Sequence, residues 1–210
     1  MDIFHSDSTL QFAGFLSFPD ISIPARALTF LTGKSGSGKS TYLRLLNATV
    51  LPSRGTILYR GKPIPEWPVL PYRREVLLAP QRDFLYDGTV RENFARFYGM
   101  REEAVPSDET IQEFLTLCCS DCSPDSLCTP LSGGEKQRVF LALFLSCQSP
   151  VLLLDEPTSA LDEQTARRFF TRLKAYLAAH DMTVVCVCHS PELVREFQDH
   201  EVRLEDWHEQ

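Results

Sequence analysis

The sequence predicts an α/β fold in which a mostly parallel sheet is flanked by helices, and two observations support this prediction. Short apolar runs have the length of buried strands, and stretches of helical periodicity, the clearest at Glu163–Ala179, lie between them. Strands that alternate with helices need crossover connections, which make the strands of a sheet parallel. The predicted strands are Leu28–Thr32, Glu75–Ala79, Val151–Leu154 and Thr183–Cys188.

Two further segments add subdomains to this core. Residues 8–23 alternate apolar and polar side chains as two edge strands would. With the strand-like island GTILYRG they predict an N-terminal antiparallel β subdomain. Residues 83–130 carry mixed charge and helical periodicity, around Thr89–Tyr98 and Glu109–Cys118, which predicts an inserted α-helical subdomain. The expected organisation is a single domain over 1–210, with 1–82 and 131–210 forming the core and 83–130 the helical subdomain.

Composition narrows the classes of function. The chain has 210 residues, of which 43% are hydrophobic and 23% charged, as expected of a globular domain. Its net charge of -7 argues against a nucleic-acid-binding surface, which needs a basic stripe. No apolar run approaches the roughly 18 residues of a membrane-spanning helix, and the N-terminus lacks the features of a signal peptide. These observations predict a cytoplasmic location.

The seven cysteines allow two interpretations. In a cytoplasmic chain disulfides are not expected, so the thiols are either ordinary buried groups or part of a metal or redox site. The segment LCCSDCSPDSLC contains one C-x-x-C pair, but no second pair or histidine pair follows at zinc-site spacing. We favour ordinary thiols. The clustered cysteines are Cys118, Cys119, Cys122 and Cys128.

The stretch LTFLTGKSGSGKST, residues 28–41, fits the phosphate-binding pattern G-x-x-x-x-G-K-[ST]. A predicted strand leads into the Gly-rich turn and a predicted helix follows it. Backbone N–H groups and the helix N-terminus meet phosphate charges, the lysine adds a positive charge and the serine hydroxyl is placed to ligate Mg²⁺. The alternative is a Gly-rich turn without a ligand. The predicted nucleotide-binding residues are Gly33, Lys34, Ser35, Gly36, Ser37, Gly38, Lys39, Ser40 and Thr41.

Two more motifs accompany this P-loop. The strand VLLLDE ends in Asp155, which we expect to hold Mg²⁺, and Glu156, which is placed to act as general base on an attacking water. The turn LSGGEKQ opens another helix and offers a second anion-binding N-terminus, formed by Ser132, Gly133 and Gly134. One chain therefore carries two phosphate-binding elements, about 95 residues apart.

These motifs together resemble the nucleotide-binding subunit of ABC transporters, in which LSGGE is the signature motif that separates this family from other P-loop NTPases. The resemblance implies a P-loop NTPase core, ATP and Mg²⁺ as ligands, and an ATPase activity. It identifies Gln81 with the glutamine that touches Mg²⁺ or the attacking water, Asp162 with the end of the D-loop (SALD, 159–162), and His189 with the switch histidine. Lys39 and Glu156 are then catalytic residues.

The resemblance also implies partners. Two cassettes pair head to tail around ATP, as a homodimer or with another cassette, and the signature turn of one completes the site of the other. The pair docks on a separate membrane permease at the inner face of the cell membrane. The compact size and the phrases LTGKSGSGKST, GTILYRGKPI and LSGGEKQR also resemble small cassettes of the metal-export type. Because most of these phrases are shared by all cassettes, the cargo and the direction of transport stay open.

The sequence departs from the family pattern at the residue expected to stack on adenine, among other places. The aromatic residue that stacks on adenine usually lies about two dozen residues before the P-loop, whereas Phe15 lies only 18 residues before Gly33. The stacking residue is then Phe15, Phe12 or Phe18, and plain core packing is the alternative. Other functions also stay open: an ABC ATPase of the translation or DNA-repair type, or a regulatory cassette that does not hydrolyse ATP.

Overall fold

The computed structural model describes residues 1–204, which form two compact units. The first, here called the core unit, contains 1–78, 149–156 and 180–204. The second, here called the helical unit, contains 79–148 and 157–179. The proposed helical subdomain, 83–130, lies within the helical unit. None of the helices among the described residues is both long enough and apolar enough to cross a membrane.

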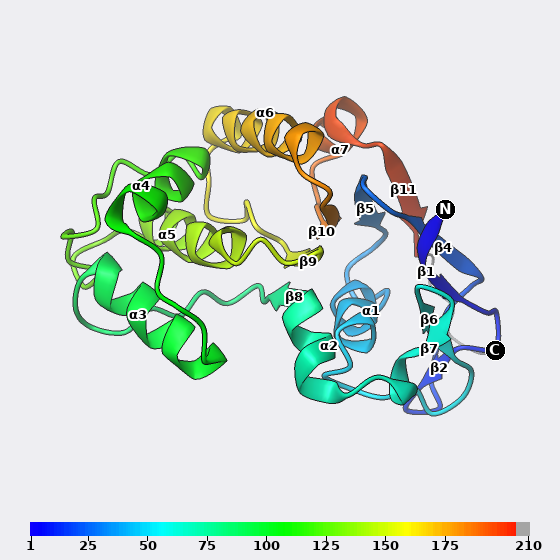
Figure 1. Cartoon of the computed structure of the whole chain (residues 1–210). Coiled ribbons are helices and arrows are strands. Elements are labelled where there is room, and N and C mark those ends of the chain that lie inside the picture. Colours follow the sequence, from blue (N-terminus) through cyan, green and yellow to red (C-terminus); the bar gives the residue numbers. More distant parts are fainter. Residues whose placement is uncertain (205–210) are drawn as a thin grey trace. The chain divides into compact units, whose positions relative to one another are not determined.

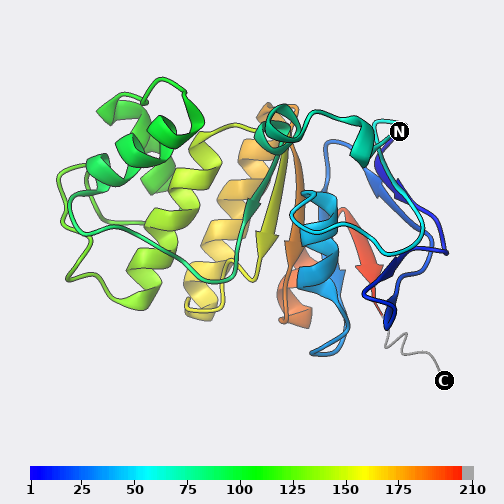
Figure 2. The ribbon, with the colours of Figure 1, turned by 90° about the horizontal axis from the view of Figure 1, so that it is seen from below.

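A five-stranded sheet in the order β11-β5-β10-β9-β8 organises the core unit (Figures 1 and 2). The β10 strand pairs in parallel with β5 and β9, and β11 pairs in parallel with β5. Val187 lies opposite both Leu31 and Asp155, so the carboxyl ends of the three central strands are level. This confirms the predicted parallel core. The strands are β5 (Leu28–Thr32), β8 (Val76–Ala79), β9 (Val151–Asp155), β10 (Thr183–Val187) and β11 (His200–Arg203).

An antiparallel sheet in the order β4-β1-β6-β7 and a small β2-β3 hairpin complete the strands of the core unit. The sequence predicted two strands within residues 8–23 and the island around β6, but not the first strand, whose Phe4 packs against Tyr59. The strands are β1 (Asp2–Ser6), β2 (Gln11–Phe12), β3 (Leu16–Ser17), β4 (Ile21–Pro24), β6 (Ile57–Tyr59) and β7 (Lys62–Pro63).

Three helices and one 3₁₀ turn belong to the core unit: α1 (Lys39–Leu46), η1 (Ile64–Glu66), α2 (Val69–Glu75) and α7 (Pro191–Phe197). Tyr42 of α1 is fully buried, and its hydroxyl shares a 3.1 Å hydrogen bond with Ser6 of β1. The sequence predicted a Pro- and Gly-rich loop where α2 forms. The helix tolerates Pro71 because this residue lies in the first turn, where backbone N–H groups have no intrahelical partner.

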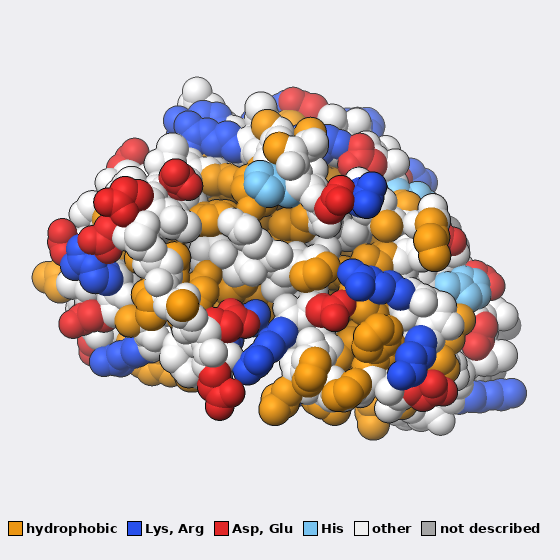
Figure 3. All heavy atoms as spheres, viewed as in Figure 1, with side chains coloured by type: hydrophobic (Ala, Val, Ile, Leu, Met, Phe, Trp, Pro, Cys, Tyr) orange, Lys and Arg blue, Asp and Glu red, His pale blue; other side chains and the backbone are white. Residues whose placement is uncertain are grey.

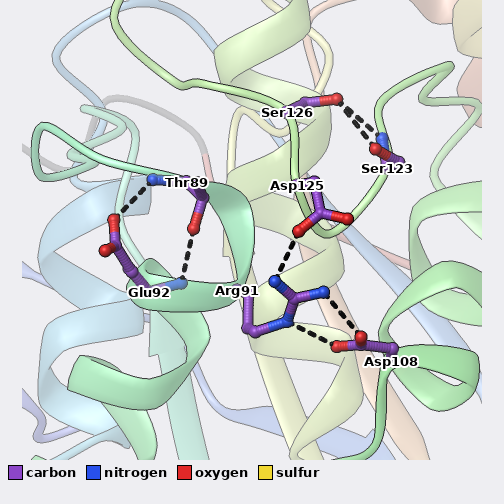
Figure 4. Close-up of polar contacts among 7 residues, drawn as sticks. All are labelled: Thr89, Arg91, Glu92, Asp108, Ser123, Asp125 and Ser126. Carbon is purple, nitrogen blue, oxygen red and sulfur yellow. Dashed lines mark hydrogen bonds and ion pairs between the residues drawn. The ribbon is translucent and has the colours of Figure 1, made fainter.

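The helical unit contains α3 (Val90–Arg101), α4 (Asp108–Leu117), α5 (Gly133–Ser146) and α6 (Glu163–Ala179). The α6 helix has its predicted bounds, and α3 begins with a capping box between Thr89 and Glu92. Arg91 joins the starts of α3 and α4, because it donates to both carboxylate oxygens of Asp108, at 2.8 and 2.6 Å, and to Asp125 at 2.5 Å (Figure 4). This fork fixes the helix ends in place.

The clustered cysteines begin at Cys118, the C-cap of α4, follow that helix in the chain and are buried. Burial raises the pKa of the Cys118 thiol far above its usual value, so this sulfur is protonated at neutral pH. Across residues 1–204, no group of three or more Cys, His, Asp and Glu side chains is arranged to hold a metal ion. The interpretation of this cluster as ordinary thiols stays a prediction.

Candidate functional site

The P-loop follows β5 and is shaped by glycines at two close approaches. Gly33 has φ +141°, and a Cβ atom built on it would lie 2.1 Å from the carbonyl oxygen of Leu204. Gly38 is the N-cap of α1 with φ +89°, and a Cβ there would lie 2.7 Å from a methyl group of Leu16. No larger residue fits either position without moving its neighbours, so the sequence pattern has a steric basis here.

The ammonium group of Lys39 lies over this loop. Its Nζ atom donates to the carbonyl oxygens of Gly33 at 2.9 Å and Lys34 at 2.7 Å, and the side chain is only 6% exposed. A positive charge is thereby held at the concave side of the loop, beside the N-terminus of α1. Both features favour an anion such as a phosphate group.

Ser40 and Asp155 meet at the carboxyl end of β9. The Ser40 hydroxyl donates to Oδ1 of Asp155 at 2.9 Å. Burial raises the pKa of Asp155, and the hydrogen bond from Ser40 and the charge of Lys39 oppose that shift. A hydroxyl and a carboxylate that share a buried corner are hard oxygen ligands of the kind Mg²⁺ prefers, so the residues present fit this ion.

Glu156 and His189 form a second pair at the same edge of the sheet. The Nε2 atom of His189 lies 2.7 Å from Oε1 of Glu156, and the Glu156 side chain is 19% exposed. Glu156 has a left-handed backbone with φ +53°, which is uncommon for a residue other than glycine. The pair brings a carboxylate that could accept a proton into contact with an imidazole, one residue beyond Asp155.

A cavity of about 800 Å³ opens beside the P-loop and His189. Its far wall comes from α7 and β11, including Arg195, Glu201 and Arg203. The hydrogen bond from Arg203 lowers the pKa of Glu201, which also accepts a 2.7 Å hydrogen bond from Thr32. Sequence reasoning missed these wall residues, since no motif marks them.

The signature turn lies in the helical unit. Ser132 is the N-cap of α5 and forms a capping box with Glu135, whose carboxylate accepts hydrogen bonds from the Ser132 backbone at 2.9 Å and hydroxyl at 2.5 Å. These bonds lower the pKa of Glu135. Gly133 and Gly134 follow in the first turn. Asp162 accepts a 2.9 Å hydrogen bond from the backbone of Thr165 and so caps α6.

The remaining predicted site residues are Gln81 and the candidates for stacking on adenine. Gln81 is exposed and follows β8 by two residues, within the helical unit. Phe15 is 61% exposed in the turn between β2 and β3, so its ring face is open to a base. Phe12 is half-buried. Phe18 is 2% exposed and packs against the ring of Tyr42 at 5.2 Å, which leaves it no free face and excludes it as a stacking residue.

The core unit therefore brings together the P-loop, the Ser40–Asp155 pair and the Glu156–His189 pair at the carboxyl ends of β5, β9 and β10. A crevice at this edge of a parallel sheet is where α/β domains bind ligands. These features define a nucleoside-triphosphate-binding domain of the P-loop class.

Comparisons with known proteins narrow this class. A sequence model described as "ABC transporter" matches residues 17–159. ABC transporter I family member 17 of Arabidopsis thaliana is 36% identical over 180 residues, 85% of this chain and 68% of that protein. The methionine import ATP-binding protein MetN of Protochlamydia amoebophila is 35% identical over 184 residues, 84% of this chain and 53% of that protein. A bacterial Atm1-family ABC exporter with ATP bound is similar in structure, with a TM-score of 0.84 and 26% identity, over 97% of this chain and 37% of that one.

The chain therefore belongs to the ABC transporter family, and within it to the ATP-binding cassettes, whose members are ATPases. It spans 68% and 53% of the length of the two curated relatives named above. The names of these relatives do not indicate whether this chain is a cassette of the metal-export type, so that expectation stays a prediction.

Proposed function

We propose that this chain binds ATP with Mg²⁺ and hydrolyses it to drive transport through a separate membrane permease. The observation that carries the proposal is the pairing of Ser40 with Asp155 and of Glu156 with His189 at one edge of the sheet, beside the P-loop. A phosphate-binding loop, a pair of magnesium ligands and a base beside a histidine are the parts that hydrolysis of a terminal phosphate needs.

Each residue has a defined task in this mechanism. The backbone of the P-loop and Lys39 bind the phosphates, while Ser40 and Asp155, with Gln81, would hold the metal ion. When bound, Mg²⁺ supplies positive charge that neutralises the transferred phosphoryl group. Glu156 accepts a proton from the attacking water at its carboxylate, and His189 orients that carboxylate and contacts the terminal phosphate. Phe15 offers its exposed ring to adenine.

We further propose that two copies pair head to tail around ATP, so that the signature turn and D-loop of one complete the site of the other. The capped start of α5 presents Ser132, Gly133 and Gly134 there as an anion-binding N-terminus. The permease would bind at the exposed rings of Phe84 and Tyr86 in the helical unit, which pack edge to face at 4.8 Å. This assembly would place the chain at the cytoplasmic face of the membrane.

Nucleic acid is not a proposed partner. On the face drawn in Figure 3, acidic and basic side chains are interspersed, and the chain carries a net charge of -7. Such a surface does not attract a phosphate backbone strongly.

The substitution Glu156→Gln tests the proposal, because it keeps the shape of the side chain and removes the base. We expect ATP binding to persist, ATP-dependent dimers to accumulate, and turnover to fall by about 10²-fold or more. Turnover is measured as phosphate release, and dimers by light scattering after size exclusion. Glu109→Gln, on the exposed side of α4, is the matched control. Near-normal turnover in Glu156→Gln would exclude Glu156 as the base, and a wild-type chain that binds ATP without turnover would indicate a regulatory cassette.

A further inference from the structure

The side chain of Gln137 joins two segments of the helical unit that are 22 residues apart in the chain. It lies on α5, one turn beyond the signature residues, and is 6% exposed. Its Nε2 atom donates to the Ser159 hydroxyl at 3.2 Å, and its Oε1 atom accepts from the backbone N–H of Ala160 at 3.0 Å. Ser159 and Ala160 are themselves exposed residues of the D-loop. A buried amide thus holds an exposed loop by both of its polar atoms.

The first turn of α5 touches the same loop. A Cβ atom built on Gly134 would lie 2.8 Å from the carbonyl oxygen of Ala160 and 3.7 Å from a methyl group of Leu161. The loop therefore packs directly on the signature turn, and a glycine is needed at this position for the close approach.

Two further hydrogen bonds hold the D-loop, one across its turn and one at the start of α6. The backbone N–H of Leu161 donates to the carbonyl oxygen of Thr158 at 3.1 Å, and the Asp162 side chain caps α6 through its 2.9 Å hydrogen bond with Thr165. These two bonds lie within the loop and at its junction with α6. The hydrogen bonds of the Gln137 side chain to Ser159 and Ala160 attach the loop directly to the signature helix, α5.

We propose that Gln137 is a positioning residue that makes the signature turn and the D-loop a single rigid surface. This inference rests on the proposed function. The surface would meet the partner cassette as one rigid body, so that the positions of Ser132 and Asp162 relative to each other are already fixed when they reach the nucleotide of the partner. In this role Gln137 acts on the loop and not on the nucleotide. Its amide suits the task because it supplies one donor and one acceptor, which leucine cannot replace and glutamate matches only at the acceptor.

The experiment compares three single variants and one double variant. Gln137→Leu removes both hydrogen bonds and leaves the Ala160 N–H without its acceptor, whereas Ser159→Ala removes only one bond, at an exposed position where the fold is not at risk. Gln112→Leu is the matched control, because Gln112 is also a glutamine whose side chain bonds another segment of the helical unit: its Nε2 atom donates to the backbone carbonyl of Cys122 at 3.2 Å. Hydrogen-exchange mass spectrometry on the peptide covering 155–166 measures the loop. Light scattering with ATP, in a Glu156→Gln background, measures dimerisation, and titration with a fluorescent ATP analogue measures binding to the monomer.

In Gln137→Leu we expect loop amides to exchange about tenfold faster and the dimer to dissociate about tenfold more readily, while ATP affinity of the monomer changes by less than about twofold. Ser159→Ala should show smaller changes of the same kind, and combining it with Gln137→Leu should add nothing. Gln112→Leu should show neither change.

Unchanged loop exchange in Gln137→Leu would overturn the inference, as would faster exchange with an unaltered dimer. A wild-type chain that stays monomeric with ATP would instead overturn the proposed function. In that case the exchange measurement alone still decides whether Gln137 holds the loop.

Discussion

The substitution Gly33→Ala tests whether the shape of the P-loop depends on close packing against Leu204, the residue that follows β11. The new methyl group would lie 2.1 Å from the carbonyl oxygen of Leu204, whereas ordinary contacts between heavy atoms are about 3.5 Å. The loop or the end of β11 must therefore move by about 1 Å or more. The residue also has φ +141°, a conformation that side chains rarely adopt.

The expected loss of stability has two terms, the strained backbone of residue 33 and a broken hydrogen bond at Leu204. The strained backbone costs about 1–3 kcal/mol. Displacing Leu204 also breaks its 2.8 Å hydrogen bond to the carbonyl oxygen of Thr32, which is worth about 1 kcal/mol net. We therefore expect a loss of roughly 2–4 kcal/mol in the free energy of unfolding, out of the 5–15 kcal/mol typical of a folded domain. ATP affinity should fall by about tenfold or more, because a moved Gly33 carbonyl no longer holds the Lys39 ammonium.

Gly36→Ala is the matched control. Gly36 also has a positive φ, +86°, but nothing lies within 4 Å of a Cβ built on it, so only the backbone term of about 1–2 kcal/mol applies. Urea denaturation followed by circular dichroism gives both free energies of unfolding, and nucleotide titration gives both affinities. Equal losses of stability in the two variants would refute the steric argument, since the contact with Leu204 would then contribute nothing.

Three further predictions concern charged groups and thiols. Lys39→Ala should weaken ATP binding by about 10²-fold or more, because the loop loses its buried positive charge; an unchanged affinity in the same titration would contradict the P-loop assignment. Asp155→Asn should raise the thermal midpoint at pH 7 while abolishing Mg²⁺-dependent turnover. Since burial raises the pKa of Asp155 above its unfolded value, the contribution of this residue to stability falls as the pH rises through that window; in melts from pH 4 to 8, Asp155→Asn should therefore gain stability relative to the wild type as the pH rises. The Cys118 and Cys186 thiols, fully buried and with raised pKa values, should react with a maleimide only after unfolding, and rapid labelling of the native chain at pH 7.5 would show that they are accessible.

Much of the parallel core could be predicted from the sequence. The strand Leu28–Thr32 and the helix Glu163–Ala179 form with their predicted bounds. The strand is a short apolar run that a Gly-rich turn ends, and the helix carries a long periodic pattern that only a helix satisfies. The motifs were visible for a related reason. The residues of the P-loop motif follow one another within residues 33–41, so their spacing can be read directly, whereas the contacts of Gly33 with Leu204 and of Gly38 with Leu16 join distant segments that no spacing reveals.

Other elements could not be predicted, because their signal lies outside the segment itself. The first strand, Asp2–Ser6, is short, and its pairing with β4 and β6 stabilises it rather than any local pattern. The α2 helix contains a proline in its first turn, and composition alone favours a loop there. The contact of Gln137 with the D-loop joins segments 22 residues apart, and no pattern in the sequence marks it.

The positions that break local rules also bear on the proposed function. Glu156 has a left-handed backbone although it is not a glycine, and Asp155, next to it, is a carboxylate whose burial raises its pKa. Gly33 is pressed against a neighbouring carbonyl. Each of these features costs stability, and all three lie at the carboxyl ends of β5 and β9. A left-handed backbone also occurs away from this edge, at Arg26, Ala48 and Arg60 among others, so it does not mark a site by itself. A buried carboxylate beside a close-packed glycine is expected where a ligand offsets the cost, because a bound cation at Asp155 and phosphates on the loop would stabilise the folded state.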